Sequence, residues 1–218
     1  MTTTNQDQLA SDFLMINSGT YFSEPSALEE QKEPDTSIID MYDLPQYDLS
    51  AHRIVVIDSY VDQELMLKQK EQISDFLSQG NLLLFSGNLF RPWLPGASSF
   101  VPKKITKHSD YNVMIAKPHP VFEGVEPDDL TYNKGVSGFF ARGHHPLPPQ
   151  AEVLLTLAGG EPITYIDRHS TNGTIVVHSG TNLLRYTNRN NTSGRIREQL
   201  KRWMLEEHAQ IALRGAVR

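Results

Sequence analysis

The sequence predicts an α/β fold: a three-layer sandwich with a mostly parallel central sheet and an added antiparallel hairpin. The main evidence is residues 53–93, whose pattern indicates strand, helix, strand. Ile54–Ile57 and residues 82–85 are unbroken apolar runs, as expected for strands buried on both faces. Two such strands joined by one helix are almost always parallel, with a right-handed crossover. Residues 152–157 and 162–167 flank a Gly-Gly turn and predict the hairpin.

The helix between the two strands has defined ends and one apolar face. Asp62 can cap its first turn, and Gly80 ends it where a left-handed residue is easiest to place. Its apolar face consists of residues at helical spacing: Met66, Ile73 and Leu77, with Leu65 and Phe76 beside them. In open parallel sheets, ligands bind outside the carboxyl ends of the strands. We therefore expect the site in the loops that follow residues 57 and 85.

Two further strands are predicted before this unit. Residues 13–16 are short and apolar, and the turn Asn17-Ser18-Gly19-Thr20 follows them, so they predict the first parallel strand. Residues 37–42 predict the second strand, and residues 43–51 a linker. Residues 26–32 suit either a short helix or a solvated loop, and both interpretations stay open.

The second half of the chain predicts shorter elements around a long loop. Residues 90–107 contain three prolines and a glycine, and an irregular loop of that length is usually functional or mobile. Residues 111–116 alternate like an edge or antiparallel strand, residues 136–141 resemble a strand, and residues 174–178 predict a third apolar strand. Ser193 can cap the last helix, whose buried stripe is Ile196, Leu200, Trp203 and Met204.

Composition limits the classes of protein and of partner. A chain of 218 residues suits one domain, which we place at 12–208 between a disordered tail, 1–11, and a C-terminal tail, 209–218. The net charge of −6 argues against nucleic acid, and the basic residues of 195–202 are typical of the wet face of a helix. No apolar run approaches the length of a membrane span, and the N-terminus has no secretory pattern, so a cytoplasmic protein is expected.

Several of these segments together resemble the class I glutamine amidotransferase-like superfamily, in its ThuA-like branch. The matching features are the strand-helix-Gly-strand unit of 54–85, the His119-Pro120 to Gly124-Val125 turn, and the late pairing of 162–165 with 174–180. The resemblance implies a flavodoxin-like sandwich. It also implies a small polar ligand, such as a carbohydrate or nucleotide derivative, because ThuA-like proteins are associated with sugar metabolism. The amidotransferase scaffold often pairs, which allows a homodimer.

The chain has no cysteine, whereas the amidotransferases of this superfamily place a cysteine in the turn after a central strand. Here that turn is Ser86-Gly87-Asn88, so glutamine hydrolysis by a cysteine nucleophile is excluded. A serine needs a neighbouring base to lose its proton at neutral pH. If the protein is an enzyme, we expect a hydrolase with Ser86, His144 and Asp58 as its catalytic residues. Ser86 also suits a capping or ligand-contacting role.

The expected ligand-binding residues lie in the loops after the strands: Ser18, Tyr60, Asn88, Arg91, Trp93 and Ser179. Small polar strand exits offer backbone N–H groups and hydroxyls to a polar ligand. Trp93 suits stacking on a sugar or base, or equally a plug that holds its loop to the core. The pair His144-His145 can point only one ring at a site, because adjacent side chains on an extended chain face opposite ways. No metal or cofactor is expected, since no recognised ligand spacing is present.

Two other features leave their interpretation open. Asp167-Arg168-His169 suits a salt-linked turn better than catalysis. The irregular segment 90–111 could instead be the contact surface of a non-catalytic interaction or regulatory subunit built on the same scaffold. The sequence therefore predicts the fold more closely than it predicts the function.

Overall fold

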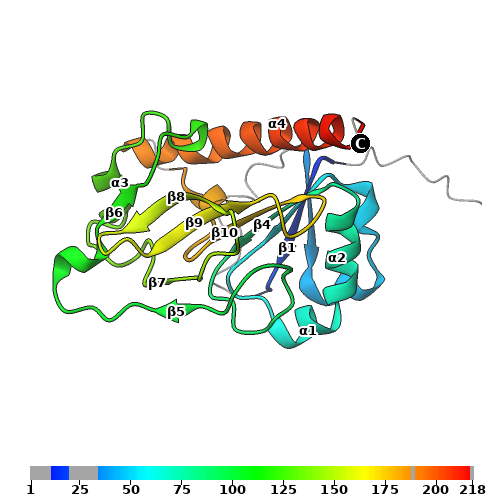
Figure 1. Ribbon diagram of the computed structural model, residues 1–218, viewed down its shortest axis with the longest axis horizontal. Helices are drawn as coiled ribbons and strands as arrows, with labels where there is room; N and C mark the ends of the chain where they lie inside the picture. Colours follow the sequence, from blue (N-terminus) through cyan, green and yellow to red (C-terminus); the bar gives the residue numbers. More distant parts are fainter. Residues whose placement is uncertain (1–10, 20–33, 188–189, 217–218) are drawn as a thin grey trace, which may run out of the picture.

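The computed structural model describes residues 11–19, 34–187 and 190–216. Its centre is an eight-stranded sheet in the order β2-β1-β3-β4-β10-β9-β8-β6 (Figure 1). The strands are β1 (Phe13–Asn17), β2 (Thr36–Asp40), β3 (Ile54–Ile57), β4 (Leu82–Ser86), β6 (Val113–Ile115), β8 (Glu152–Leu157), β9 (Pro162–Asp167) and β10 (Thr174–His178). The first five strands in the sheet order are parallel, and the other three pair antiparallel. This arrangement confirms the predicted α/β class and its added hairpin.

The strands β3 and β4 are parallel neighbours, as predicted. Ile54 pairs with Leu82 and Ile57 with Phe85. The connection contains two helices in place of one, α1 (Gln63–Lys68) and α2 (Lys70–Ser78), which meet at Gln69. Asp62 caps α1, since its Oδ1 accepts hydrogen bonds from the backbone N–H groups of Glu64 and Leu65 at 2.9 and 3.2 Å.

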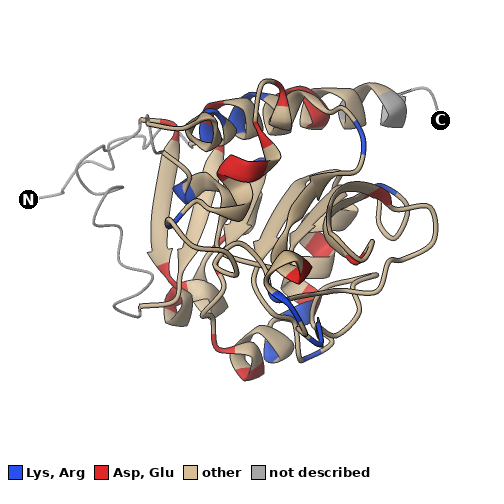
Figure 2. Cartoon of the chain, turned by 90° about the vertical axis from the view of Figure 1, so that its left-hand side faces the viewer, with Lys and Arg blue, Asp and Glu red and all other residues tan. Residues whose placement is uncertain are grey.

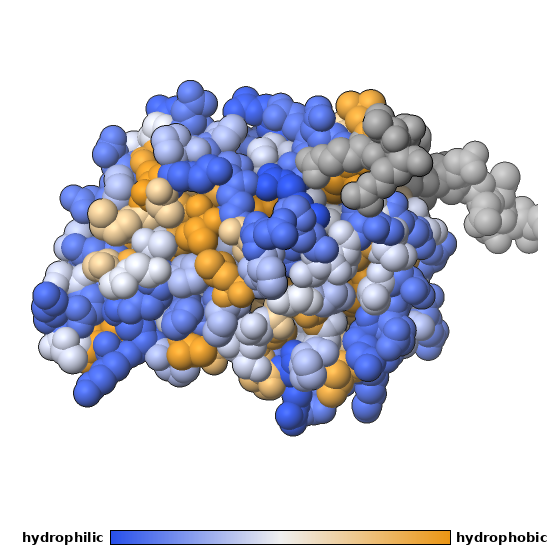
Figure 3. All heavy atoms as spheres, viewed as in Figure 1, coloured by the Kyte–Doolittle hydropathy of each residue, from blue (hydrophilic) through white to orange (hydrophobic). Residues whose placement is uncertain are grey.

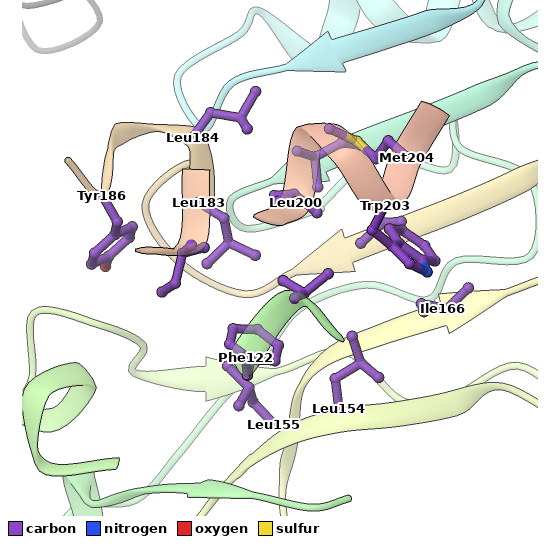
Figure 4. Close-up of a cluster of buried hydrophobic side chains, with 14 of the residues drawn as sticks. Phe122, Leu154, Leu155, Ile166, Leu183, Leu184, Tyr186, Leu200, Trp203 and Met204 are labelled. Atoms are coloured by element: carbon purple, nitrogen blue, oxygen red, sulfur yellow. The ribbon is translucent and has the colours of Figure 1, made fainter. Parts of the chain in front are cut away.

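Helices cover both faces of the sheet, which makes three layers. The helix α4 (Ile196–Ala216) runs along one face, while α1 and α2 lie on the other (Figure 1). On the α4 face, the sheet contributes Val56, Leu84 and Val176 to one buried cluster, part of which is drawn in Figure 4. The predicted stripe of α4 packs into this cluster: Ile196, Leu200, Trp203 and Met204. On the other face Val55, Leu83 and Ile175 pack with residues of α1 and α2 in a second cluster.

The remaining elements are short. They are the two-stranded sheet β5 (Val101–Pro102) and β7 (Gly143–His144), the helix α3 (Pro127–Thr131), and the 3-10 helices η1 (Met41–Gln46), η2 (Leu49–Ala51), η3 (His108–Tyr111), η4 (Pro120–Phe122), η5 (Leu183–Arg185) and η6 (Thr192–Arg195). The predicted linker 43–51 is thus mostly 3-10 helix. The predicted edge strand within 111–116 is confirmed as β6, which pairs antiparallel with β8.

Three predictions about elements differ from the structure or fall outside it. Residues 136–141 form turns with one isolated bridge, Ala141 to Gly180, so the strand predicted there is wrong. The cause is local, because Gly135 and Gly138 adopt φ of +80° and +89°, which end an extended run. The helix α4 continues to Ala216, through most of the segment predicted as a tail. The helix-or-loop alternative for 26–32 and residues 1–10 of the predicted tail 1–11 lie outside the described residues. Ser11, the last residue of that predicted tail, is 8% exposed and donates a hydrogen bond to the carbonyl of Phe13.

A charged network ties α4 to the amino-terminal edge of the parallel strands. Arg168 Nε and Nη2 donate to the two carboxylate oxygens of Glu207 on α4, at 2.7 and 3.1 Å, and Nη1 donates to Glu152 at 2.6 Å. Thr174 Oγ1 donates to the same Glu207 at 3.1 Å. Charged residues of both signs lie along α4 (Figure 2), but the Glu207 side chain is only 7% exposed. Its carboxylate therefore depends on these protein donors.

We predict that Glu207→Gln lowers the free energy of unfolding by about 3 kcal/mol, because removing one partner of a buried ion pair leaves the other uncompensated. The matched control is Arg53→Gln, which breaks the ion pair with Asp12 on a side chain that is 62% exposed. Exposed pairs contribute below about 1 kcal/mol. Urea denaturation measures both variants. Equal losses would contradict the assignment of Glu207 as the anchor of α4.

Candidate functional site

Four polar residues lie side by side at the edge of the sheet where the parallel strands end, on the face that packs against α4. Ser86 pairs with His178, and His178 pairs with Thr164 across the antiparallel β9. Asp58 follows β3 by one residue, and continuing the β3–β4 register places it level with Ser86. Because side chains alternate along a strand, Asp58, Ser86 and His178 face the same way as the residues two positions earlier, which contact α4. We call these four residues, Asp58, Ser86, His178 and Thr164, the polar row.

The centre of the polar row is buried. Ser86, His178 and Thr164 are all 0% exposed. His178 Nδ1 and Thr164 Oγ1 share a hydrogen bond of 2.8 Å, and the ring of Phe140 packs edge-on against the imidazole at 5.0 Å. Within the described chain, neither Ser86 Oγ nor His178 Nε2 has a hydrogen-bond partner. Burial lowers the pKa of His178 to about 3, so its imidazole is neutral at physiological pH.

The outer end of the polar row carries an ion pair. Arg185 Nη2 donates to Asp58 Oδ2 at 2.6 Å, and Asp58 Oδ1 accepts from the backbone N–H and the hydroxyl of Ser59 at 2.6 and 3.0 Å. Arg185 reaches Asp58 from η5, which Asn182 caps. The Asp58 side chain is 4% exposed and that of Arg185 is 24% exposed. The buried carboxylate thus fixes a guanidinium at the surface of the carboxyl edge.

The exits of β3 and β4 approach each other closely at this edge. Gly87 has φ +138°, and a Cβ there would stand 2.7 Å from Cα of Ser59. Its N–H donates to the carbonyl of His178 at 2.8 Å, which extends the β4–β10 pairing by one step. Only glycine fits a backbone approach of that kind. The turn predicted from Ser86-Gly87-Asn88 therefore joins three strand ends.

A second histidine lies on the opposite face of the same edge. His145 is 0% exposed, accepts a hydrogen bond at Nε2 from the backbone N–H of Leu89 at 3.0 Å, and shares one at Nδ1 with Ser179 Oγ at 2.8 Å. Burial, and then the neighbouring His144, lower the pKa of His145 to about 4. Both of its ring nitrogens are engaged in holding the 87–100 loop to the exit of β10. We assign it a structural role.

The structure separates the residues that the sequence proposed as catalytic. Ser86 and Asp58 lie in the polar row, but His144 lies in β7, paired with Val101 of β5 outside the central sheet. The histidine that shares their row is His178. The sequence gives a signal for it, since His178 ends a buried strand. Its neighbour β4 is far away along the chain, so the pairing could not be read from the pattern.

The proposed ligand-binding residues fall into three groups. Ser18 and Ser179 are 3% and 2% exposed at the exits of β1 and β10, and Tyr60 is 55% exposed after β3. Asn88 and Arg91 are exposed, and Arg91 is ion-paired with Glu64 of α1.

Trp93, the remaining proposed ligand-binding residue, is 1% exposed and packs edge-on against Phe85 at 5.2 Å. Of its two interpretations, this packing favours the plug that holds the loop to the core. Thr164, His178 and Arg185 are site residues that sequence reasoning missed.

The Asp167-Arg168-His169 turn lies at the other edge of the sheet. Asp167 Oδ1 accepts from the backbone N–H groups of His169 and Ser170 at 2.8 and 3.1 Å, while Arg168 belongs to the Glu207 network. This geometry matches the salt-linked turn. In the described residues, no group of three or more His, Cys, Asp or Glu side chains is placed to hold a metal ion.

Comparison with known proteins shows the fold alone. No family model and no curated protein matches the chain. Among solved structures, it is similar to the "Cytoplasmic Protein STM1381" from Salmonella typhimurium LT2, with a TM-score of 0.51 and 11% identity over 80% of this chain and 81% of that one. It is also similar to the exo-beta-1,4-mannosidase Op5Man5 from Opitutaceae bacterium strain TAV5, with a TM-score of 0.45 and 14% identity over 94% of this chain. The chain spans 35% of that mannosidase's length.

These observations define the class of protein: a mixed α/β domain in three layers, with a buried polar row and an ion pair at the carboxyl edge of its parallel strands. Among the residues described, no helix is long and apolar enough to cross a membrane.

The two buried histidines make stability fall in acid. The unfolded chain binds a proton on each near pH 6.5, whereas burial keeps both neutral in the folded state down to about pH 4 for His145 and about pH 3 for His178. The unfolded state therefore binds more protons below pH 6.5, and the stability that the neutral rings contribute is lost as the pH falls.

We predict that His178→Gln reduces the slope of the unfolding free energy against pH, between pH 6.5 and 4.5, by up to about 1.4 kcal/mol per pH unit.

Urea denaturation at a series of pH values measures this slope, and His169→Gln on an exposed turn is the matched control. An unchanged slope in His178→Gln would show that this histidine is not buried in its neutral form.

Proposed function

We propose that this protein is a cysteine-free domain of the class I glutamine amidotransferase-like type, in its ThuA-like branch, that binds a small polar ligand. The ligand is a carbohydrate or nucleotide derivative, bound at the carboxyl edge of the parallel strands in the cytoplasm. The observation that carries this proposal is the Arg185–Asp58 ion pair, which holds a partly exposed guanidinium beside three strand exits. Parallel α/β sheets bind their ligands at this edge.

The surroundings of the ion pair suit a ligand with hydroxyl or phosphate oxygens. A guanidinium presents several N–H donors in a fixed plane, which matches phosphate and carboxylate groups. Small or polar residues lie near the ion pair at this edge. Ser59 is next to Asp58, and Gly180 and Thr181 follow β10. Because Asp58 is committed to Arg185 and Ser59, it orients the guanidinium and leaves ligand contact to Arg185 and to the strand exits.

Glutamine hydrolysis through a cysteine is excluded by composition, so any reaction at this edge uses another nucleophile. Ser86 is the hydroxyl that the polar row places beside a histidine. A hydrolase reaction is therefore the first chemical expectation for this site.

A second candidate function is a non-catalytic interaction subunit on the same scaffold. Segment 90–111 carries exposed apolar side chains, with Phe90 63% and Val101 41% exposed. In the view of Figure 3, exposed apolar residues are interspersed with hydrophilic ones. Scattered exposed apolar side chains are common on the surfaces of monomers. Size-exclusion chromatography with light scattering separates a monomer from a homodimer, and a ligand response without self-association favours the first function.

We predict that a panel of sugars, sugar phosphates and nucleotides contains compounds that raise the melting temperature of the wild-type protein. At a hundredfold excess over Kd, binding adds about 2.7 kcal/mol, which raises Tm by roughly 5–10 °C in a domain of this size. Arg185→Gln should abolish the shift, because the ligand loses its anchoring donor. Thermal shift assays measure both proteins.

Two further arginine variants locate the site. Arg53→Gln, at the opposite edge of the sheet, should keep the wild-type shift. Arg91→Ala tests whether the ligand binds beside α1, where Arg91 pairs with Glu64. If Arg91→Ala loses the thermal shift while Arg185→Gln keeps it, the ligand lies beside α1 and not beside Arg185. The absence of any shift in the wild-type protein would overturn the proposal.

A further inference from the structure

The polar row contains two buried reactive groups that hydrogen bonding leaves unused. Ser86 Oγ and His178 Nε2 are both fully buried and unpaired among the residues that the structure describes. They come from neighbouring strands in register, and such strands lie about 4.8 Å apart. Nine other buried side-chain atoms of the described residues also lack a partner, such as Trp93 Nε1 and Asp167 Oδ2. What distinguishes Ser86 and His178 is that a hydroxyl and an imidazole occupy adjacent positions in register.

One ring nitrogen of His178 is engaged in a hydrogen bond and the other is not. Thr164 engages Nδ1 at 2.8 Å, and Phe140 packs against the ring, so Nε2 is the nitrogen left for other chemistry. A Cβ at Gly180 would stand 2.7 Å from His178 Nε2 and 2.0 Å from the carbonyl oxygen of Phe140. The nitrogen therefore points along β10 toward the carboxyl edge, and a side chain at residue 180 would block it.

We propose that Ser86 is a nucleophile and His178 its general base, with Thr164 as the positioning residue that fixes the ring. The proposal rests on the ligand site at the carboxyl edge, and it names the substrate class as a carboxylic ester of a small polar alcohol. Arg185 lies beside Asp58 at the adjacent position of the row, where it can bind the polar part of such a substrate. A hydroxyl nucleophile activated by a neighbouring imidazole recurs on unrelated folds.

The reaction balances without a further reagent. Ser86 Oγ forms a bond to the ester carbonyl carbon as its proton passes to His178 Nε2. The carbon–oxygen bond to the alcohol then breaks, and His178 returns the proton to the departing alcohol. Water next attacks the acyl group on Ser86, giving up a proton to His178. The bond between the acyl carbon and Ser86 Oγ then breaks, His178 returns its proton to Oγ, and the carboxylic acid leaves.

A substrate can reach Ser86 and His178 only if the segment that covers them, residues 138–141, moves. Ala141 forms an isolated antiparallel bridge with Gly180, and Phe140 lies directly against His178. This segment also contains Gly138 at φ +89° and Phe139, which is 55% exposed. The segment is held by this isolated bridge and by Phe140, which also packs against Tyr186 at 5.4 Å.

The test is covalent labelling of the full chain with a fluorophosphonate probe, in which the Ser86 oxygen bonds to phosphorus and fluoride leaves. We expect one adduct per chain, mapped by mass spectrometry to the peptide that contains Ser86. Ser86→Ala should remove it, and Ser78→Ala, on the exposed end of α2, should label like the wild type. His178→Gln should slow labelling at least about 100-fold, as expected on loss of a general base.

Two more variants test position and access. Thr164→Val should slow labelling, and Thr164→Ser should restore it, because only the hydroxyl is required. Phe140→Ala removes the cover and should label faster than the wild type. Melting temperatures of all variants verify that each is folded.

The proposal is overturned if both the wild type and Phe140→Ala remain unlabelled, if another serine is labelled, or if folded His178→Gln labels at the wild-type rate. Failure here is distinct from failure of the ligand site. A protein that shows Arg185-dependent thermal shifts without labelling binds a ligand without this chemistry, and labelling without such shifts would remove the ligand site alone.

Discussion

The parallel, in-register alignment of β3, β4 and β10 is the constraint on which the rest of this structure depends. It brings Asp58, Ser86 and His178 to one level from three places that are far apart in the sequence. Without that alignment each would be an isolated polar residue at the end of an apolar strand. With it, they share one face and one edge, and the neighbouring β9 adds Thr164 from the opposite direction. The candidate site is thus a product of strand pairing more than of any loop.

Alternation along β10 assigns the two buried histidines to different faces. His178 points toward α4, while Ser179, the next residue, binds His145 on the other face. His145 uses both nitrogens to fasten a loop, and aromatic rings of Phe85 and Phe100 pack around it. His178 uses only one nitrogen within the described chain. Two neutral histidines on opposite faces of the sheet therefore differ in hydrogen bonding, and this difference decides which of them could act on a ligand.

The sequence predicted the parts of the fold that depend on local patterns. The strands on either side of α1 and α2 are apolar runs joined by a capped amphipathic segment, and both periodicity and capping are visible along the chain. The same reasoning identified Ser86 and Asp58, because each directly follows or ends a buried run. It failed at 136–141, where two glycines in the left-handed region outweigh an apolar pattern.

It also proposed His144, which lies in β7 outside the polar row, and did not find His178. The place of His178 depends on which strand lies beside β4, and that pairing joins Ser86 and His178 across 92 positions of the chain, which no local signal specifies. Arg185 was missed for the same reason, since its partner Asp58 lies 127 residues away. Non-local pairing is the information that a single sequence does not display.

Each edge of the sheet combines paired polar groups with buried atoms that have no partner among the described residues, such as Asp167 Oδ2 at the amino edge. At the amino edge Arg168 binds two carboxylates, and Glu207 accepts from both Arg168 and Thr174. At the carboxyl edge the described structure leaves Ser86 Oγ and His178 Nε2 buried without partners, which costs stability. A fold can carry such a cost where the surrounding structure over-determines it. Here the segment that carries Phe140 and Ala141 packs over His178 and Gly180, so these two groups are covered at the edge of the sheet where parallel α/β sheets bind their ligands.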